Sequence, residues 1–418
     1  MKKLFVLLLA LFCTASCYSQ EMNYATDNAA YWYIKAFEEL PRFNKNDLNA
    51  VSQIKSKEEF RQINPVIRGK LEAVDVQKYL ELIKTAKEST KHCYYNISEG
   101  LKNHKDIFFP ERFFEESSFV VSGIAWKSLF YEKYEDAANI YISYLDFAAD
   151  LLQPDTTIYQ ATGASKYATY VLMSIFNAFS GDVPESFKTP VISCIKEKFN
   201  IFNSIDKKQI VANTCNLISK NLEYLEANPN ELARFASKQK AKENEGFAKC
   251  VKARRELCEA YDEYRATDGI NYAEADTSKA VAELMEKGYL SLLNKNTPEY
   301  YTCPQKGTFT VKTSKYLPTE IECSCETANL QDEEINRDYF EKTFKPEKEV
   351  ILAYLQKING LDHSAEPALT EVMAEDQEFK KKLDGSVLAE ELAPTSYRYN
   401  VFLFCYNQCL SLFQMLQQ

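Results

Sequence analysis

Apolar residues recur every three to four positions along most of the chain, which predicts a series of consecutive α-helices. The Thr26-Asp27 pair suits the N-cap of a first helix that we expect to end at Pro41. A second helix is predicted over Val74 to Tyr95. The most regular stretch, 119–152, has two apolar stripes with a turn near Lys133-Tyr134-Glu135, and this pattern predicts a helical hairpin.

Further helices follow the hairpin. One is predicted from Ile158 to Phe179, before the Gly181-Asp182-Val183-Pro184 stop. Another begins at Phe247 and is expected to end near Asp268-Gly269. The end of the chain, Tyr397 to Leu416, is apolar nearly all round, so we expect it to pack into the helical core of the first 230 residues.

The hydrophobic period changes from about four to two in one short region. Residues 308–311 and 319–323 alternate apolar and polar side chains, which predicts two strands of a small sheet. A short helix is expected before them, closing at Gly288. The fold class expected is therefore mainly α: a helical-hairpin domain with an inserted α+β module, one helix plus a two- or three-stranded antiparallel sheet.

These patterns divide the 418 residues into four parts. Residues 1–19 are a signal peptide, 20–235 a helical domain, 245–327 the α+β module, and 328–418 a C-terminal helical segment that packs on the first domain. Acidic and Lys-rich turns in the last part are typical of a solvated face.

The N-terminal segment predicts export. Lys2 and Lys3 precede an unbroken apolar run from Leu4 to Phe12, which is the length of a signal-peptide core and too short for a membrane span. Two processing routes stay open: a lipobox-like Thr14-Ala15-Ser16-Cys17 that would make Cys17 a lipid-carrying N-terminus, or cleavage before Gln20. The expected location is the periplasm or cell envelope, with contact to a membrane only through a lipid anchor at Cys17.

Charge and motifs narrow the function. A net charge of −10 gives no electrostatic footprint for nucleic acid. Only three His are present, and no nucleophile elbow, Walker loop, dinucleotide fingerprint or zincin motif occurs. Glu115-Glu116 and Asp146 or Asp150 could be paired carboxylates, but helices of this charge content produce such pairs by chance. We expect a non-enzyme without cofactor.

Two resemblances concern the helical part. The stretch Tyr131 to Tyr141 resembles the middle of a tetratricopeptide hairpin, without a second copy at the repeat period. The stretch Asp27 to Tyr31, followed by helical pairs, resembles uncharacterised secreted helical proteins of environmental bacteria. Neither resemblance implies an activity.

The third resemblance concerns residues 245–327. A helix with an early cysteine, a Gly-Tyr-Leu turn, a Cys-Pro-x-x-Gly-x-Phe-Thr stretch and a terminal Cys-Ser resemble the globular part of type IV pilin and pseudopilin-like proteins. The matching residues are Gly288-Tyr289-Leu290, Cys303-Pro304, Gly307 to Thr310 and Cys323-Ser324. The membrane-embedded assembly helix of that family is absent, so the resemblance implies a recognition or structural module and not a catalyst.

The cysteines of this module have three possible states. An oxidising compartment favours disulfides, in which Cys303 pairs with Cys323, and Cys325 with Cys250 or Cys258. Free thiols are the second state. Zinc is the third, but a zinc ribbon needs Cys-x2-Cys knuckles, whereas position 306 is Lys and the second cluster is Cys-x-Cys.

Three functions are compatible with these observations. The first is a non-catalytic interaction or scaffold protein of the cell envelope with an envelope protein as partner. The second is a periplasmic peptide or glycan binder that uses an aromatic groove, suggested by 27 Tyr and 26 Phe. The third is an enzyme of unrecognised type. We expect the first.

Overall fold

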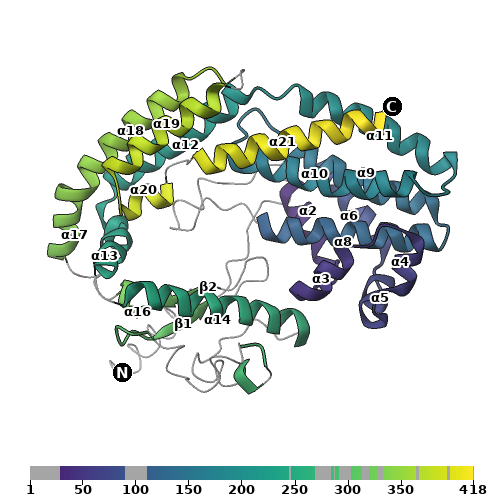
Figure 1. The fold of residues 1–418 in the computed structure, drawn as a ribbon, viewed down its shortest axis with the longest axis horizontal. Coiled ribbons are helices and arrows are strands. Elements are labelled where there is room, and N and C mark those ends of the chain that lie inside the picture. The colour runs from purple at the N-terminus through teal and green to yellow at the C-terminus, as the bar shows by residue number, and fades with distance from the viewer. Residues whose placement is uncertain are drawn as a thin grey trace, which may run out of the picture.

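The computed structural model is mainly helical and has one two-stranded antiparallel sheet among the residues it describes (Figure 1), which confirms the mainly α class. The described residues are 29–89, 111–243, 246–268, 284–286, 288–290, 303–312, 320–327, 333–363, 367–392 and 396–417. The signal segment, Cys17 and most of the helix expected before Gly288 lie outside this set. No helix in the described part of the chain is long and apolar enough to cross a membrane.

The N-terminal helices form one limb of the molecule (Figure 1). Their order is α2 (Ala29–Glu38), α3 (Lys45–Ser52), α4 (Lys57–Gln62), α5 (Pro65–Glu72), α6 (Val76–Ser89), α8 (Glu111–Phe130), α9 (Tyr134–Asp150), α10 (Ile158–Phe179) and α11 (Glu185–Asn203). The expected hairpin corresponds to α8 and α9, which pack on each other. Its turn contains Glu132 with φ 59°, a left-handed conformation that reverses the chain within three residues.

The three short helices α3, α4 and α5 were not predicted, because each is too short to show a periodic apolar stripe. Local polar caps define them instead. Asn44, Ser56 and Asn64 each accept a hydrogen bond from a backbone N–H in the first turn of the following helix. All three helices contact α8. Gly123 on α8 allows this close approach, since a Cβ there would lie 2.9 Å from Val51 Cγ1.

The second limb contains most of the helices that follow α11, except α14, α16 and α21. They are α12 (Lys207–Ala227), η1 (Pro229–Leu232), α13 (Ala233–Lys242), α17 (Glu333–Tyr339), the π-turn η4 (Phe340–Phe344), α18 (Lys345–Gly360), α19 (Pro367–Lys382) and α20 (Val387–Leu392). The core of this limb is separate from that of the first limb and includes Ile218, Leu222, Tyr354, Leu355 and Phe379.

The last helix, α21 (Ser396–Gln417), joins the two limbs. Its first half supplies Tyr399, Phe402 and Tyr406 to the core of the second limb. Its second half supplies Cys409 and Phe413 to the core of the first limb, against α10 and α11. These two successive packing surfaces explain most of the apolar pattern of α21, whereas Phe404 and Met415 are exposed, at 66% and 53%.

A third, smaller core belongs to the module at the foot of the second limb (Figure 1). Here α14 (Phe247–Asp268) packs on the sheet of β1 (Phe309–Lys312) and β2 (Glu320–Cys323), and α16 (Ser324–Thr327) follows directly. The strands pair with Phe309 opposite Cys323 and Val311 opposite Ile321. The module contacts the second limb through α13, which touches α14 and α16. Neither this arrangement nor the hairpin packing tests the pilin-like resemblance.

Candidate functional site

Four cysteine side chains meet at the centre of the module. The sulfur atoms of Cys250, Cys303, Cys323 and Cys325 all lie within 4.8 Å of one another. Cys250 is on the first turn of α14, Cys303 precedes β1, Cys323 ends β2 and Cys325 is in α16. Three of the four residues are buried and Cys325 is partly exposed. Four thiols at these separations are a ligand set that could hold one metal ion.

The loop before β1 is shaped by the cysteine cluster. Lys306 has φ 61° and its N–H donates to the Cys303 carbonyl at 2.9 Å, which closes a tight turn. Gly307 follows, and a Cβ at this position would lie only 2.6 Å from Cys323 Sγ and 2.9 Å from the backbone nitrogen of Cys325. Glycine is therefore required at position 307, because any larger side chain would clash with the Cys323 sulfur.

A second set of bonds lies at the same, open end of the hairpin. The Thr308 N–H donates to Ser324 Oγ at 2.8 Å, and the Ser324 N–H donates to the Thr308 carbonyl at 2.9 Å. These bonds extend the pairing one residue beyond the sheet. They hold the Cys303 loop beside the Cys323–Cys325 segment.

The thiols differ in acidity. Burial opposes ionisation of Cys303, but the backbone N–H groups of Gly307 and Gln305 and the neighbouring thiols together lower its pKa. Burial raises the pKa of Cys250 to about 12 and also raises the pKa of Cys325. Cys303 is thus the most readily ionised of the four thiols.

An ion pair between an arginine and a glutamate lies next to the cysteine cluster. Arg254 lies one turn after Cys250 on α14, and its two terminal nitrogens each contact a carboxylate oxygen of Glu326 at 2.6 Å. The same guanidinium donates to the Ile321 carbonyl at 3.2 Å. Arg254 therefore fixes α14 to α16, and its charge only partly opposes the rise that burial causes in the pKa of the Cys250 thiol.

The sequence singled out five cysteines in this module, and the structure brings four of them together. Cys258 lies two turns beyond Cys250 on α14 and is not among the four, although it packs against the module core. All described cysteines are free thiols. The sulfurs of Cys250 and Cys325 are 3.8 Å apart, against about 2.05 Å in a disulfide. The structure thus shows no disulfide among the described residues, and the expected pairings stay predictions.

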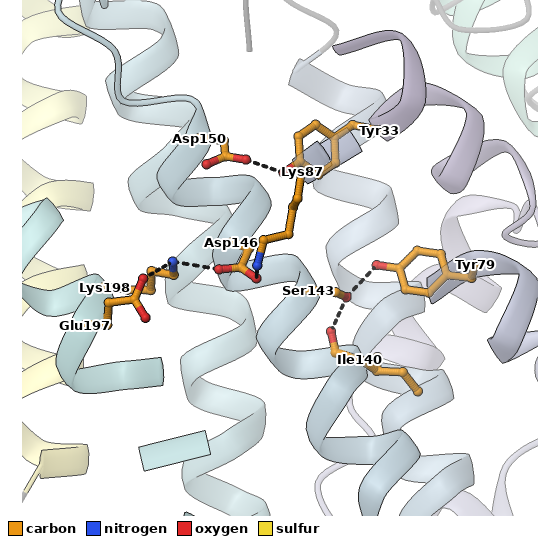
Figure 2. Close-up of polar contacts among 9 residues, drawn as sticks. All are labelled: Tyr33, Tyr79, Lys87, Ile140, Ser143, Asp146, Asp150, Glu197 and Lys198. Carbon is orange, nitrogen blue, oxygen red and sulfur yellow. Dashed lines mark hydrogen bonds and ion pairs between the residues drawn. The ribbon is translucent and has the colours of Figure 1, made fainter. Parts of the chain in front are cut away.

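A second polar cluster lies inside the first limb (Figure 2). Asp146 on α9 accepts from Lys198 of α11 at 2.6 Å and from Lys87 of α6 at 2.5 Å. The Asp146 and Lys198 side chains are only 5% and 9% exposed. Burial alone would lower the pKa of Lys198, but its bonds to Asp146 and Glu197 raise it above the ordinary value. Lys198 therefore keeps its charge in the interior.

Asp150 extends this cluster by one turn of α9. The Tyr33 hydroxyl of α2 donates to its carboxylate (Figure 2). Burial, with a smaller contribution from Asp146, raises the pKa of Asp150 despite this bond. The pair considered a chance feature of the sequence is thus a junction at which α2, α6 and α11 are tied to α9. Glu115 and Glu116 are not part of it, since they bind Lys166 and Arg42 instead.

Among the residues that the structure describes, most aromatic side chains are buried. The largest fully buried side chains include Tyr33, Tyr79, Tyr141, Tyr144 and Tyr167. Tyr79 and Tyr141 each form a hydrogen bond to a buried serine, Ser143 and Ser174. These tyrosines are occupied in helix packing and do not line a groove.

Comparison with known proteins gave no match: no protein family, no curated protein and no solved structure is similar to this chain. The resemblances stated from the sequence consequently remain predictions. The geometry of the two clusters is the evidence on which a function can be proposed.

Proposed function

We propose that this chain is a non-catalytic interaction or scaffold protein, in which two helical limbs present the module of α14, β1, β2 and α16 to a partner. One observation carries the proposal: the module has its own hydrophobic core, distinct from the two cores of the limbs. A unit with its own core keeps its surface independently of the limbs. The predicted export makes an envelope protein the expected partner.

The exposed side of α14 supplies the surface for this role. It has Val251, 41% exposed, and three exposed basic side chains, Lys249, Lys252 and Arg255. Arg255 is paired with the exposed Glu259 at 3.4 Å, a contact that solvent screens. Exposed basic side chains suit an acidic partner surface, because complementary charge steers association.

Charge reversal tests the proposal. The module variant changes Lys249, Lys252 and Arg255 to Glu, and the matched control changes three exposed lysines of the limbs to Glu. The control residues are Lys196, Lys208 and Lys220. Both variants change the net charge by the same amount, so an effect of total charge is cancelled.

The measurement is chemical cross-linking in the native cells, followed by mass spectrometry of the captured proteins. We expect an envelope protein to be cross-linked to the wild-type chain and the control, and lost from the module variant. Loss from the control alone, or no cross-linked envelope protein with the wild-type chain, would refute the proposal. Equal thermal unfolding of both variants and the wild-type chain confirms that folding is unchanged.

A further inference from the structure

We propose that Cys250, Cys303, Cys323 and Cys325 bind one Zn²⁺ ion as a structural centre of the module. Zinc in such sites is tetrahedral, with Zn–S bonds of about 2.3 Å, so neighbouring sulfurs lie about 3.8 Å apart. The Cys250 and Cys325 sulfurs are separated by 3.8 Å. No other pair of the four exceeds 4.8 Å, so sub-ångström to one-ångström side-chain adjustments complete the tetrahedron.

The arrangement favours a shared ion over disulfides. Disulfides require two close pairs, and the two pairs need not approach each other. Here every sulfur is a neighbour of the other three. One ion held by four ligands requires that arrangement. The sulfurs also come from four different local structures, so one ion joins the helix, the hairpin loop, the second strand and α16 at a single point.

Backbone N–H groups are already directed at the sulfurs. Those of Gln305 and Gly307 bond to the Cys303 sulfur, and that of Cys325 bonds to the Cys323 sulfur. Such donors stabilise thiolates and orient them as metal ligands. The close approach of Gly307 to Cys323 makes this loop a ligand-bearing turn, even though it lacks the second cysteine of a zinc knuckle.

The ligand type suits a divalent ion that prefers sulfur. A divalent ion with four thiolates has a formal charge of −2, and the ion pair of Arg254 with Glu326 lies beside it on the adjacent turn of α14. Soft thiolate ligands in a tetrahedral set select zinc or iron over calcium and magnesium. We assign zinc because the four ligands close the site completely, as in structural zinc centres.

The module has a hydrophobic core of its own, but this core is smaller than those of the two limbs. Its sheet has two strands of four residues, and a two-stranded sheet is marginal in water by itself. Zinc ligation supplies folding free energy directly in such small units. Removal of the ion should therefore disorder α14, β1 and β2 and leave the two limbs folded.

The first experiment measures metal in the full-length chain purified under reducing conditions and supplied with Zn²⁺. We expect one zinc per chain by elemental analysis, and X-ray absorption with four sulfur neighbours at about 2.3 Å. Replacement by Co²⁺ should give the thiolate charge-transfer and visible bands of tetrahedral cobalt. These measurements need no variant, so they stand even where a substitution prevents folding.

The second experiment compares cysteine variants. Cys303→Ser and Cys323→Ser should weaken zinc binding at least about 100-fold in a chelator competition, since each loses a ligand. The matched controls are Cys258→Ser on the same helix and Cys405→Ser on α21, and both should bind zinc as the wild-type chain does.

Four results would overturn the proposal. The first is a reduced wild-type chain that binds no zinc, and the second is unchanged zinc affinity in both ligand variants. The third is native protein whose intact mass shows these four cysteines as disulfides. Iron in place of zinc in the native protein would overturn the choice of metal. None of these results depends on the partner-binding experiment, so the two proposals fail separately.

Discussion

The buried pair of Asp146 and Lys198 makes a quantitative prediction for the first limb. In the Asp146→Asn variant the side-chain volume is preserved, but Lys198 loses the carboxylate at 2.6 Å. The Lys198 side chain is 9% exposed and stays largely desolvated. Removing one partner of a buried ion pair costs about 3–5 kcal/mol, because the other charge is left buried.

The structure places the expected cost at the lower end of this range. Lys198 retains Glu197 at 2.7 Å, a carboxylate that is 67% exposed and therefore a weaker, screened partner. We expect Asp146→Asn to lower the free energy of unfolding by about 3 kcal/mol. At about 2–4 °C per kcal/mol for a unit of this size, the melting temperature should fall by about 6–12 °C.

Lys87 is the internal control for this estimate. Its side chain contacts the same carboxylate at 2.5 Å but is 48% exposed, so solvent screens the interaction. We expect Lys87→Met to cost about 0–1 kcal/mol. The double variant Asp146→Asn with Lys198→Met should recover part of the loss, because it removes the unpaired charge.

Tryptophan fluorescence during urea unfolding is the appropriate assay. The chain has two Trp, and both Trp32 and Trp126 pack in the core of the first limb, so the signal reports this limb alone. A cost below about 1 kcal/mol for Asp146→Asn, or an equal cost for Lys87→Met, would refute the reasoning from buried charge.

Three further predictions concern single positions. Asp150 has a raised pKa in the folded state, so the native protein binds the proton of this carboxyl more tightly than the unfolded chain does. The free energy of unfolding should therefore fall as pH rises from about 4 through that pKa. Asp150→Asn should flatten this slope in urea titrations at several pH values, and an unchanged slope would contradict the assignment. Gly307→Ala should abolish zinc binding, because its Cβ would meet a cysteine sulfur at 2.6 Å, whereas Gly360→Ala, with no atom within 4 Å, should leave zinc binding and stability unchanged. Gly123→Ala should cost about 1–3 kcal/mol by urea unfolding, because its Cβ would meet Val51 at 2.9 Å, and a gain in stability would show that helix propensity prevails.

The helices with long apolar stripes could be predicted from the sequence. The hairpin of α8 and α9 and the long helix α14 have enough turns for a period near 3.6 to stand out. The two short strands were visible because alternation changed the period locally. By contrast, α3, α4 and α5 have six to eight residues each, and their existence depends on caps and on packing against α8.

The cysteine cluster shows why the site was harder to recognise. A local search for two-cysteine knuckles fails because the Cys303 loop supplies one sulfur and the Cys323–Cys325 segment two. The fourth sulfur comes from Cys250, 75 residues before Cys325, and only the packing of α14 on β2 brings them together. The one sequence signal is Gly307, whose small size is needed only when a neighbouring atom approaches closely.

The buried charges of Asp146 and Lys198 can be recognised in the sequence from their positions on apolar helix faces. Asp146 lies within the apolar stripe of α9, and Lys198 lies one turn after Cys194 and one turn before Phe202 on the buried side of α11. A charged residue on an apolar helix face predicts a buried partner, since burial of an isolated charge is too costly. The identity of that partner depends on how α9 and α11 pack.

The predicted export and the proposed zinc binding place opposite demands on the same four thiols. In an oxidising compartment Cys250 and Cys325, the pair at 3.8 Å, could form a disulfide that removes two ligands. Disulfide formation requires a free thiolate to attack, and a thiolate held by zinc is not free to do so. The order of events therefore decides the outcome: a chain that binds zinc before it meets an oxidant keeps all four ligands, and one that is oxidised first is tied by disulfides instead. Whether the native protein holds zinc or disulfides at these cysteines therefore shows whether the module folded before or after it met an oxidant.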